Sequence, residues 1–413
     1  MGARMALRDR SFVFDGLESP LQLNDPAIVD LATRILHGWP VQDCPTDNHR
    51  DPFAEVSILG SDKWRVRAPQ GATPEQVHDP VNAICDLIVE ISWEQLRSRS
   101  DLLCLHAAAV EFDGRLVLMP NARRAGKSTL AVALAQLGHR VFTDDFLPIQ
   151  RDPSTGALSG LANGIAPRLR IPVPQGVSDR FRAFVDGDGG PQNRQYKYLT
   201  DCPVPPHGTT APIGAIVLLD RQDTPQVSRL ESLSDADAIS SLILQNFARH
   251  LNGGAILKAL AALAEQLPCY RLVYSDVESA AALLSTCPEL AALPAAHVDE
   301  PLDGRPSPLK TYQGSPHGLQ HGAPALRLDG CEEVVCGSET FVATPDGRAI
   351  HRLNPGLGLY WRLLAEPTTV TETTEILAEI YPEVEIAQLR VDAGAAFDQL
   401  HHLGLIRSVP PSH

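Results

Sequence analysis

The sequence predicts an α/β protein of more than one domain, and three observations support this class. The chain has 413 residues, enough for two or three domains of roughly 100–200 residues each. A strand, a loop, a helix and a second strand follow one another between residues 105 and 145, an order typical of a parallel βαβ unit. Residues 291–324 are rich in Pro, Gly, His and Ala with little periodicity, which predicts an interdomain linker.

The composition excludes several classes of protein. The formal net charge of −15 argues against broad binding to nucleic acid or to an anionic membrane. No run of 18 apolar residues occurs, so no transmembrane segment is expected. The first eleven residues are charged and contain no apolar run, so we expect no signal peptide. The eight cysteines are scattered without a C-x-x-C pair, and we expect reduced thiols in a cytoplasmic protein.

Residues 1–98 are predicted to form a small N-terminal α/β lobe that packs on the rest of the chain. Short apolar runs at Val56–Leu59 and Trp64–Val66 favour strands. The segment Pro80–Arg97 carries apolar residues at helical spacing and predicts a long helix.

Residues 99–290 are predicted to form the central α/β domain. Asp113-Gly114 is a signal for a tight hairpin, and Gly138 is placed to end a helix. The predicted strands are Leu105–Phe112, Arg115–Met119, His139–Thr143, Ala215–Leu219 and Tyr270–Tyr274. The predicted helices are Ser128–Leu137, Ala236–His250, Ala255–Gln266 and Val277–Leu284.

Residues 325–413 are predicted to form a separate small domain. It begins with two short strands, at Glu333–Val335 and Thr340–Ala343. Three helices follow. The first begins at the cap Asn354-Pro355, the second at the capping box Thr369-x-x-Glu372, and the third runs from about Ile386 to Leu403.

A phosphate-binding loop is predicted between the strand at 115–119 and the helix that follows it. The pattern G-x-x-x-x-G-K-[ST] is matched, apart from its first glycine, by Asn121, Ala122, Arg123, Arg124, Ala125, Gly126, Lys127 and Ser128, with Thr129 next in the chain. Asn121 replaces the first glycine, and Asn is among the residues that best tolerate a left-handed backbone.

The chemistry of this loop is specific. Its backbone N–H groups and the helix N-terminus favour a bound phosphate. Lys127 would reach the β and γ phosphates of ATP, and the Ser128 hydroxyl would bind Mg²⁺. The alternative is a helix N-terminus with an incidental lysine.

Two carboxylates end the next predicted strand. Asp144 and Asp145 follow Lys127 by 17 and 18 residues, and parallel packing would bring this strand end close to the loop. Neighbouring strand residues face opposite ways, so one aspartate could hold Mg²⁺ and the other accept a proton from a hydroxyl. The alternative is that one aspartate is functional and the other is solvated or caps a helix. From its spacing alone, His106 is predicted to be a hydrogen-bonded histidine of the core.

Over Leu105–Asp145 the chain resembles the HPr kinase/phosphorylase family. The stretch LHAAAVEFDGRLVLMPNARRAGKSTLAVALAQLGHRVFTDD has the family's order of His, strand, P-loop, helix, Gly-His-Arg, strand and Asp-Asp. The resemblance implies a compact α/β kinase core related to phosphoenolpyruvate carboxykinase. It also implies Mg²⁺-dependent transfer of phosphate from ATP to a protein serine, with residues 99–290 as the catalytic domain.

The resemblance implies roles for single residues. Lys127 and Ser128 match the family's phosphate and metal residues, Asp145 its proton-accepting aspartate, and His106 its active-site histidine. Asp144 would then assist with the metal or with structure.

Two features of the family are not recognisable, namely a further acidic metal ligand and a later signature stretch. Their loss leaves open the phosphorylase reaction, a homo-oligomer such as the family's hexamer, and HPr as the substrate. The chain instead reads Pro167-Arg168-Leu169-Arg170-Ile171-Pro172, where Arg168 or Arg170 could clamp phosphate or lie exposed in solvent. It looks more like divergent HPr-kinase-related proteins found with peptide-modification genes.

Residues 333–408 resemble PqqD-type domains, which bind precursor peptides. The likeness lies in the strand pair, in Leu353–Leu364 and in Phe397-x-x-Leu400-x-x-Leu403-Gly404-Leu405-Ile406. It implies a winged-helix-like domain at 325–413 that adds a leader peptide as an edge strand. Residues 326–413 hold 13 acidic and six basic residues, a net charge of −7, which disfavours DNA and suits a basic leader. The alternative is a folded domain without peptide binding, whose acidic faces are simply solvated.

Three functions follow from these patterns. The first is a kinase for a Ser or Thr hydroxyl of a ribosomally made precursor peptide, tethered through its leader to the C-terminal domain. The second is a nucleotide-gated recruitment module with little catalysis, which Asn121 and the missing acidic ligand favour. The third is a kinase for a small metabolite. The joint presence of five residues favours catalysis; these are His106, Lys127, Ser128, Asp144 and Asp145.

Overall fold

The computed structural model describes residues 10–44, 51–68, 76–248, 250–302, 319 and 322–409. Contacts divide the chain into two compact units. The first contains residues 1–234, 244–248 and 262–301, and the second contains 235–243, 249–261 and 302–413. No helix in the described ranges is long and apolar enough to cross a membrane.

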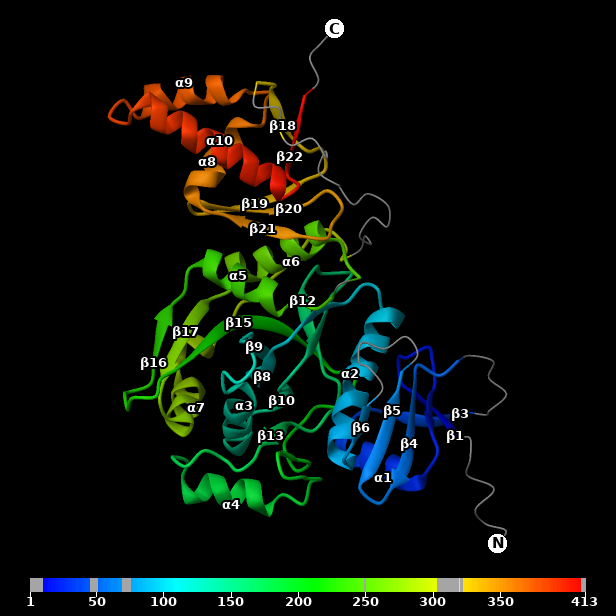
Figure 1. Ribbon diagram of the computed structural model, residues 1–413. Coiled ribbons are helices and arrows are strands. Elements are labelled where there is room, and N and C mark those ends of the chain that lie inside the picture. Colours follow the sequence, from blue (N-terminus) through cyan, green and yellow to red (C-terminus); the bar gives the residue numbers. More distant parts are fainter. Residues whose placement is uncertain are drawn as a thin grey trace. The chain divides into compact units, whose positions relative to one another are not determined.

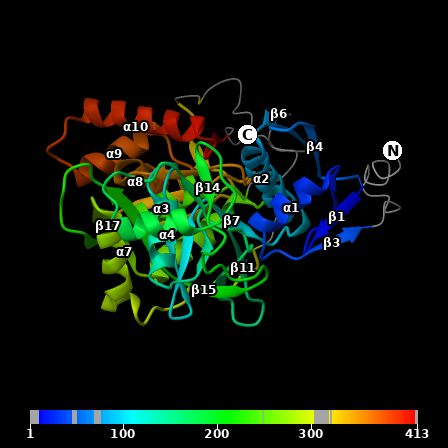
Figure 2. The ribbon, with the colours of Figure 1, turned by 90° about the horizontal axis from the view of Figure 1, so that it is seen from below.

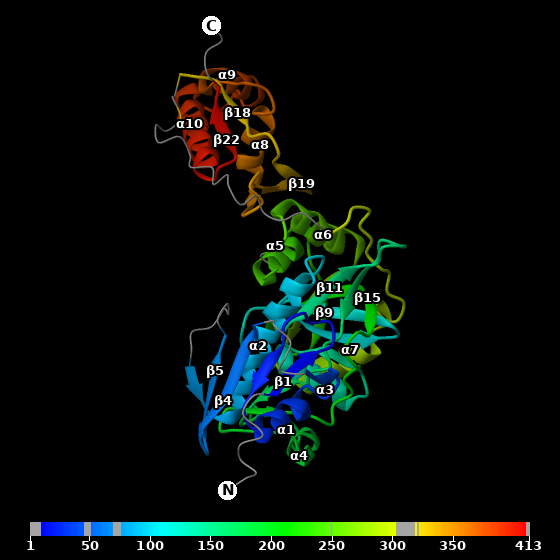
Figure 3. The same cartoon turned by 90° about the vertical axis from the view of Figure 1, so that its right-hand side faces the viewer.

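The N-terminal part of the first unit is a six-stranded sheet with two helices against it (Figure 3). Its strand order is β3-β1-β2-β4-β5-β6. The elements are β1 (Arg10–Phe14), β2 (Leu21–Leu23), α1 (Pro26–Ile35), β3 (Val41–Cys44), β4 (Ala54–Gly60), β5 (Lys63–Arg67), β6 (Gln76–His78) and α2 (Pro80–Ser98). The predicted strands at 56–59 and 64–66 and the helix at 80–97 are confirmed. Asp79 caps α2 by accepting the N–H groups of Val81 and Asn82.

This N-terminal part contacts the rest of the first unit through backbone hydrogen bonds. The N–H of Gly38 donates to the carbonyl of Gly164 at 2.9 Å, and the Gly38 carbonyl accepts from His207 N–H at 2.7 Å. A Cβ at Gly38 would lie 2.7 Å from the Gly164 Cα, and one at Gly164 would lie 2.3 Å from the Gly38 carbonyl carbon. Only glycine fits at either position, because any side chain would push the two segments apart.

The central sheet of the first unit has nine strands (Figure 1). Seven run in the order β10-β8-β9-β15-β12-β11-β7, while β17 pairs with β15 and with β16. These strands are β7 (Leu103–Leu105), β8 (Ala108–Phe112), β9 (Arg115–Met119), β10 (Val141–Thr143), β11 (Leu147–Arg151), β12 (Leu158–Leu161), β15 (Thr210–Arg221), β16 (Arg229–Ser232) and β17 (Cys269–Tyr274). β15 runs parallel to both β9 and β17. The chain is therefore mixed α/β, as predicted.

Helices α3 (Lys127–Gln136), α4 (Asp179–Gly187) and α7 (Val277–Thr286) share one core with this sheet (Figure 2). Buried side chains of α3 such as Leu130 and Leu134 pack there with Phe181 of α4 and Leu284 of α7. α3 is apolar on most sides because it is covered by the sheet and by both of these helices.

The predicted order of strand, helix and strand is confirmed, with one strand interposed. β8 and β9 form a two-residue hairpin at Asp113 and Gly114, which have φ of 46° and 79°. Positive φ at both central positions is what such a turn requires. β9 and β10 are parallel to each other, but β8 lies between them and pairs antiparallel with both.

Three predicted boundaries are wrong. The strand predicted at Leu105–Phe112 is two strands, since β7 pairs with β11 whereas β8 pairs with β9 and β10. The helix predicted at Ala236–His250 is α5 (Asp235–Gln245), and residues 246–247 turn to pair with the chain around Cys104. The predicted linker at 291–324 begins with packed residues, because Ala296 and Val298 bond the backbone beside β12. Its residues 303–318 and 320–321 lie outside the described part.

The second unit contains the C-terminal residues and parts of α5 and α6 (Gly253–Gln266). Its sheets are β18 with β22, and β19-β20-β21. Its elements are β18 (Ala325–Arg327), β19 (Glu332–Cys336), β20 (Glu339–Ala343), β21 (Ile350–Leu353), α8 (Pro355–Leu363), α9 (Val370–Ile380), α10 (Ile386–His402) and β22 (Ile406–Ser408). Both predicted strands are confirmed, as are the Asn354 cap and the capping box of Thr369 and Glu372. Trp361 and Phe397 lie in its core.

Candidate active site

The phosphate loop joins β9 to α3, and glycine shapes its end. Gly126 caps α3 with φ of 100°. A Cβ there would lie 2.7 Å from the Tyr274 hydroxyl, which donates to the carbonyl of Ala125 at 3.3 Å. The left-handed non-glycine residue of the loop is Arg124, with φ of 70°. The prediction that Asn121 replaces glycine by tolerating a left-handed backbone is therefore wrong.

Asn121 instead ties the start of the loop to the neighbouring strand. Its Oδ1 accepts from the N–H of Leu219 at 2.8 Å, and its Nδ2 donates to the Leu219 carbonyl at 3.0 Å. The side-chain amide thus pairs with β15 as a peptide group would, just after β9 ends. A glycine could not make either bond.

Lys127 is buried, and its ammonium lies inside the loop. Nζ donates to the carbonyls of Asn121 at 2.5 Å and Ala122 at 3.1 Å. Burial lowers the pKa of Lys127, and the charges of Asp145 and Asp144 only partly oppose this. The first turn of α3 also leaves backbone N–H groups without helical partners. This end of α3 can therefore hold a phosphate.

Asp144 is a buried carboxylate beside Ser128. Burial raises the pKa of Asp144 to about 6, the charge of Asp145 adds to this, and a hydrogen bond with Ser128 opposes it. Asp144 Oδ2 also accepts the backbone N–H of Arg168 at 3.3 Å. The carboxylate is 8% exposed and poorly compensated, so a bound cation would stabilise its charge.

Asp145 lies in a different environment although it is the next residue. The hydroxyl of Thr143 accepts the N–H groups of Asp145 and Phe146 at 3.1 and 3.2 Å and shapes the turn after β10. Asp145 Oδ1 lies 3.1 Å from His106 Nε2, and Oδ2 lies 3.6 Å from Arg168 Nη2. Burial raises the pKa of Asp145, but the His106 bond and the Arg168 charge outweigh it and the pKa is lowered. Its side chain is 49% exposed, so a substrate can reach it.

The two predicted arginines lie on β13 (Arg168–Arg170), which pairs with β14 (Tyr196–Tyr198). The Arg168 guanidinium lies 4.8 Å from the centre of the Tyr196 ring and also faces Asp145. Arg170 is exposed and donates to the Tyr196 hydroxyl at 3.2 Å. The structure thus brings Arg168 to the two aspartates, whereas the guanidinium of Arg170 contacts Tyr196.

Helix α2 of the N-terminal part contacts the β13–β14 strand pair. The buried hydroxyl of Tyr198 lies 3.1 Å from the Cys85 sulfur on α2. Asn193, just before β14, donates to the α2 cap Asp79 at 2.9 Å. Residues 1–98 therefore help to hold the strands that carry Arg168.

The residues at this end of α3 fit a nucleotide phosphate and Mg²⁺. Lys127 and the helix N-terminus supply positive charge, and Ser128 and Asp144 supply the oxygen ligands that Mg²⁺ prefers. In the described ranges no group of three His, Cys, Asp or Glu side chains is arranged to hold a metal ion, so waters and phosphate oxygens would complete the shell of the cation.

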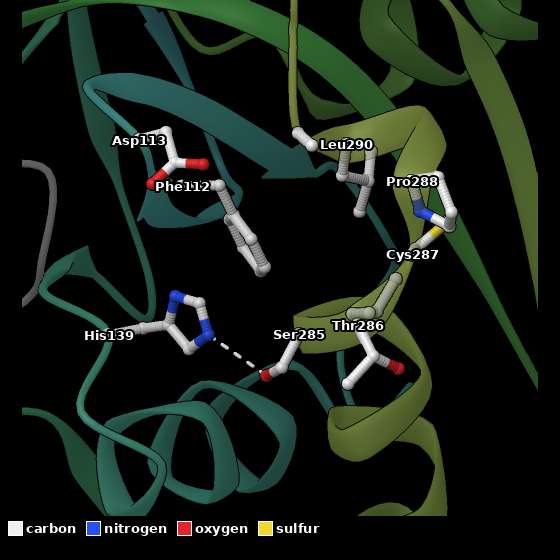
Figure 4. Close-up of a pocket in the computed structure, with 10 residues that line it drawn as sticks. Phe112, Asp113, His139, Ser285, Thr286, Cys287, Pro288 and Leu290 are labelled. Atoms are coloured by element: carbon white, nitrogen blue, oxygen red, sulfur yellow. Dashed lines mark hydrogen bonds between the residues drawn. The ribbon is translucent and has the colours of Figure 1, made fainter.

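A pocket of about 210 Å³ lies at the other end of α3 (Figure 4). Its polar centre is a hydrogen bond of 2.9 Å between His139 Nε2 and the Ser285 hydroxyl. His139 Nδ1 faces the Glu111 carbonyl at 3.1 Å, and a carbonyl only accepts, so Nδ1 carries the proton and Ser285 donates to Nε2. α3 separates His139 from Lys127 by its ten residues, or about 15 Å.

Three residues of the site were not predicted from the sequence. Gln245 bonds both the backbone and the ring of His106. Tyr198 pairs with Arg168 across β13 and β14, and the Thr143 hydroxyl accepts the backbone N–H of Asp145. The run Thr143-Asp144-Asp145 resembles a hydroxyl-capped turn and was a usable signal. Gln245 lies 139 residues from His106 and has no such signal.

The second unit presents free strand edges. Within the described residues, β19 and β21 each pair with β20 alone in their sheet, so each leaves one edge. β19 is largely exposed, with the Val335 side chain 56% exposed. An extended peptide could add a strand at such an edge.

Comparisons with known proteins give matches to two parts of the chain. No curated protein matches it. Among solved structures, the HPr(Ser) kinase/phosphatase from Coxiella burnetii matches at 15% identity and a TM-score of 0.22, covering 44% of this chain and 91% of that chain. The family model of coenzyme PQQ synthesis protein D (PqqD) matches residues 339–406. The C-terminal part of the chain is thus similar to PqqD.

Proposed function

We propose that the protein is an ATP-dependent kinase that phosphorylates a Ser or Thr hydroxyl of a ribosomally made precursor peptide. The observation that carries this proposal is the cluster at the start of α3, where a buried lysine, a hydroxyl, two aspartates and a histidine come together. These residues are Lys127, Ser128, Asp144, Asp145 and His106.

The two aspartates suit two different roles. Asp145 is ionised and half-exposed, and it would accept the proton of the substrate hydroxyl as that oxygen bonds to the γ-phosphorus and ADP leaves. His106 donates to one of its oxygens and leaves the other for the substrate, with Arg168 close by. Arg168 and Lys127 would stabilise the charge on the transferred phosphate.

Asp144 and Ser128 would hold Mg²⁺. When bound, the cation neutralises charge on the phosphates and orients them for in-line transfer. Lys127 would leave the loop carbonyls of Asn121 and Ala122 and turn to the phosphates. In the protein without nucleotide, these two carbonyls hold the ammonium beside the place where the phosphates would bind.

The similarity of residues 339–406 to PqqD supports a peptide substrate. A leader peptide held on an edge of the β19-β20-β21 sheet would tether the rest of the precursor, which raises its local concentration to about millimolar with a flexible connection. The net charge of −7 over residues 326–413 suits a basic leader. The eight scattered cysteines form no disulfide within the described residues, and reduced thiols would suit a cytoplasmic location.

A nucleotide-gated recruitment module is the second candidate. The observation that favours it is Asn121, whose side chain serves the strand pairing of the loop where the motif has glycine. Such a module would bind peptide and nucleotide without transferring phosphate. A kinase for a small metabolite would need no peptide at all.

The test is the intact mass of a candidate precursor peptide, encoded near this gene, after incubation with protein, ATP and Mg²⁺. We expect a gain of one phosphate, about 80 Da, that is lost in Lys127→Ala and in Asp145→Asn. Arg140→Ala is the matched control, since this exposed basic residue follows the far end of α3. Tight peptide binding without any mass gain would reject the kinase for that peptide and favour the recruitment module.

A further inference from the structure

Gln245, the last residue of α5, holds His106 at two points. The His106 backbone N–H donates to the Gln245 carbonyl at 2.8 Å, and His106 Nδ1 lies 3.0 Å from Gln245 Oε1. Phe247 N–H also donates to the Cys104 carbonyl at 3.1 Å. The chain after α5 therefore runs beside the break between β7 and β8 and fixes the histidine there.

His106 bonds a different partner with each ring nitrogen. The ionised Asp145 only accepts, so His106 Nε2 must carry a proton to bond it. Gln245 faces Nδ1 on the other side of the ring. The two bonds together fix the orientation of the imidazole beside Asp145.

We propose that Gln245 is a positioning residue for His106. The inference rests on the proposed kinase function, because positioning matters only if Asp145 and His106 take part in phosphate transfer.

The first test compares two variants of Gln245. Gln245→Met keeps the length of the side chain but cannot bond Nδ1, and we expect kcat to fall about 10- to 100-fold with the KM for ATP unchanged. Gln245→Glu keeps an acceptor facing Nδ1, and we expect it to stay within about fivefold of wild type. Leu244→Ala is the control, since this neighbour on α5 is 79% exposed, and its rate should be unchanged.

The second test reads the histidine itself and needs no catalysis. In the full-length protein labelled with ¹⁵N-histidine, the His106 ring signals are identified by their loss in His106→Gln. We expect Gln245→Met to shift or broaden these signals and Gln245→Glu to preserve a protonated Nε2. Unchanged ring signals in Gln245→Met would overturn the positioning role, even if the kinase activity is real. Absent phosphate transfer by wild type would instead reject the proposed function.

Discussion

The two ends of α3 differ in their charged groups. Lys127 and two aspartates lie at its N-terminal end, and His139 and Ser285 lie beyond its C-terminal end. At the N-terminal end, the surrounding protein only partly offsets the cost of burying the charges of Lys127 and Asp144. Burial lowers the pKa of Lys127 and raises that of Asp144 to about 6. At the far end, His139 bonds Glu111 and Ser285 with both ring nitrogens. Charges left unsatisfied by the protein favour a charged ligand, whereas a satisfied histidine serves the fold.

The largest expected effect is the loss of Lys127. Lys127→Ala should lower the rate of phosphate transfer about 10²–10³-fold or more, because the cation that contacts the transferred phosphate is gone. Initial rates with saturating ATP measure this. A loss of less than about tenfold would place the phosphate elsewhere and remove the contrast between the two ends of α3.

Asp144→Asn should remove activity and yet stabilise the ligand-free protein. The folded pKa of about 6 lies above the unfolded value of 3.8, so the native state binds this proton more tightly. The destabilising effect of the charge is complete above pH 6, reaches at most about 3 kcal/mol, and disappears as the pH falls from 6 to 4. Urea unfolding of both proteins at pH 7.5 and pH 4 measures it. Equal stabilities at pH 7.5 would contradict the buried charge.

Asn121→Gly restores the motif glycine but should lower the free energy of unfolding by about 1–3 kcal/mol. The reason is that the backbone N–H and carbonyl of Leu219 lose their partners. Asn121→Asp can still accept from the N–H but cannot donate, and it should fall between the two. Chemical denaturation ranks the three proteins. A glycine variant as stable as wild type would mean that water replaces both bonds.

The smallest expected effect is at the far end of α3. Ser285→Ala removes one partly buried hydrogen bond to His139, and it should cost about 0.5–1.5 kcal/mol of stability. Phosphate transfer should stay within about twofold of wild type, since this end holds no reacting group. Thermal unfolding and initial rates are compared on the same sample. A large loss of rate with little loss of stability would assign a function to this pocket.

The residues predicted from the sequence are those whose signal is local. The hairpin at Asp113-Gly114 and the caps at Asn354 and Thr369 depend on neighbours within a few residues, and the structure contains them. The loop and the Asp144-Asp145 pair were found for the same reason. Their roles in phosphate transfer remain predictions.

What the sequence could not reveal depends on distant partners. An apolar run from 105 to 112 does not say that its two halves pair with different strands, so the break at His106 was missed. The role of Asn121 was predicted from its backbone preference alone, because the partner of its side chain, Leu219, is 98 residues away. Gln245 was missed for the same reason, since it is 139 residues from His106. The surroundings of His106 and Asn121 are thus set by tertiary neighbours that leave no mark beside them in the chain.

The contact between Gly38 and Gly164 has a consequence for how the protein can be divided. Two backbones that touch without side chains leave no layer that water could replace, so a fragment beginning at residue 99 would bare peptide groups that now bond the N-terminal segment. Such a fragment would also lack the support of α2 behind the strand of Arg168. The smallest piece able to use ATP is therefore expected to include the N-terminal residues, and any shortened version of this protein should be cut elsewhere.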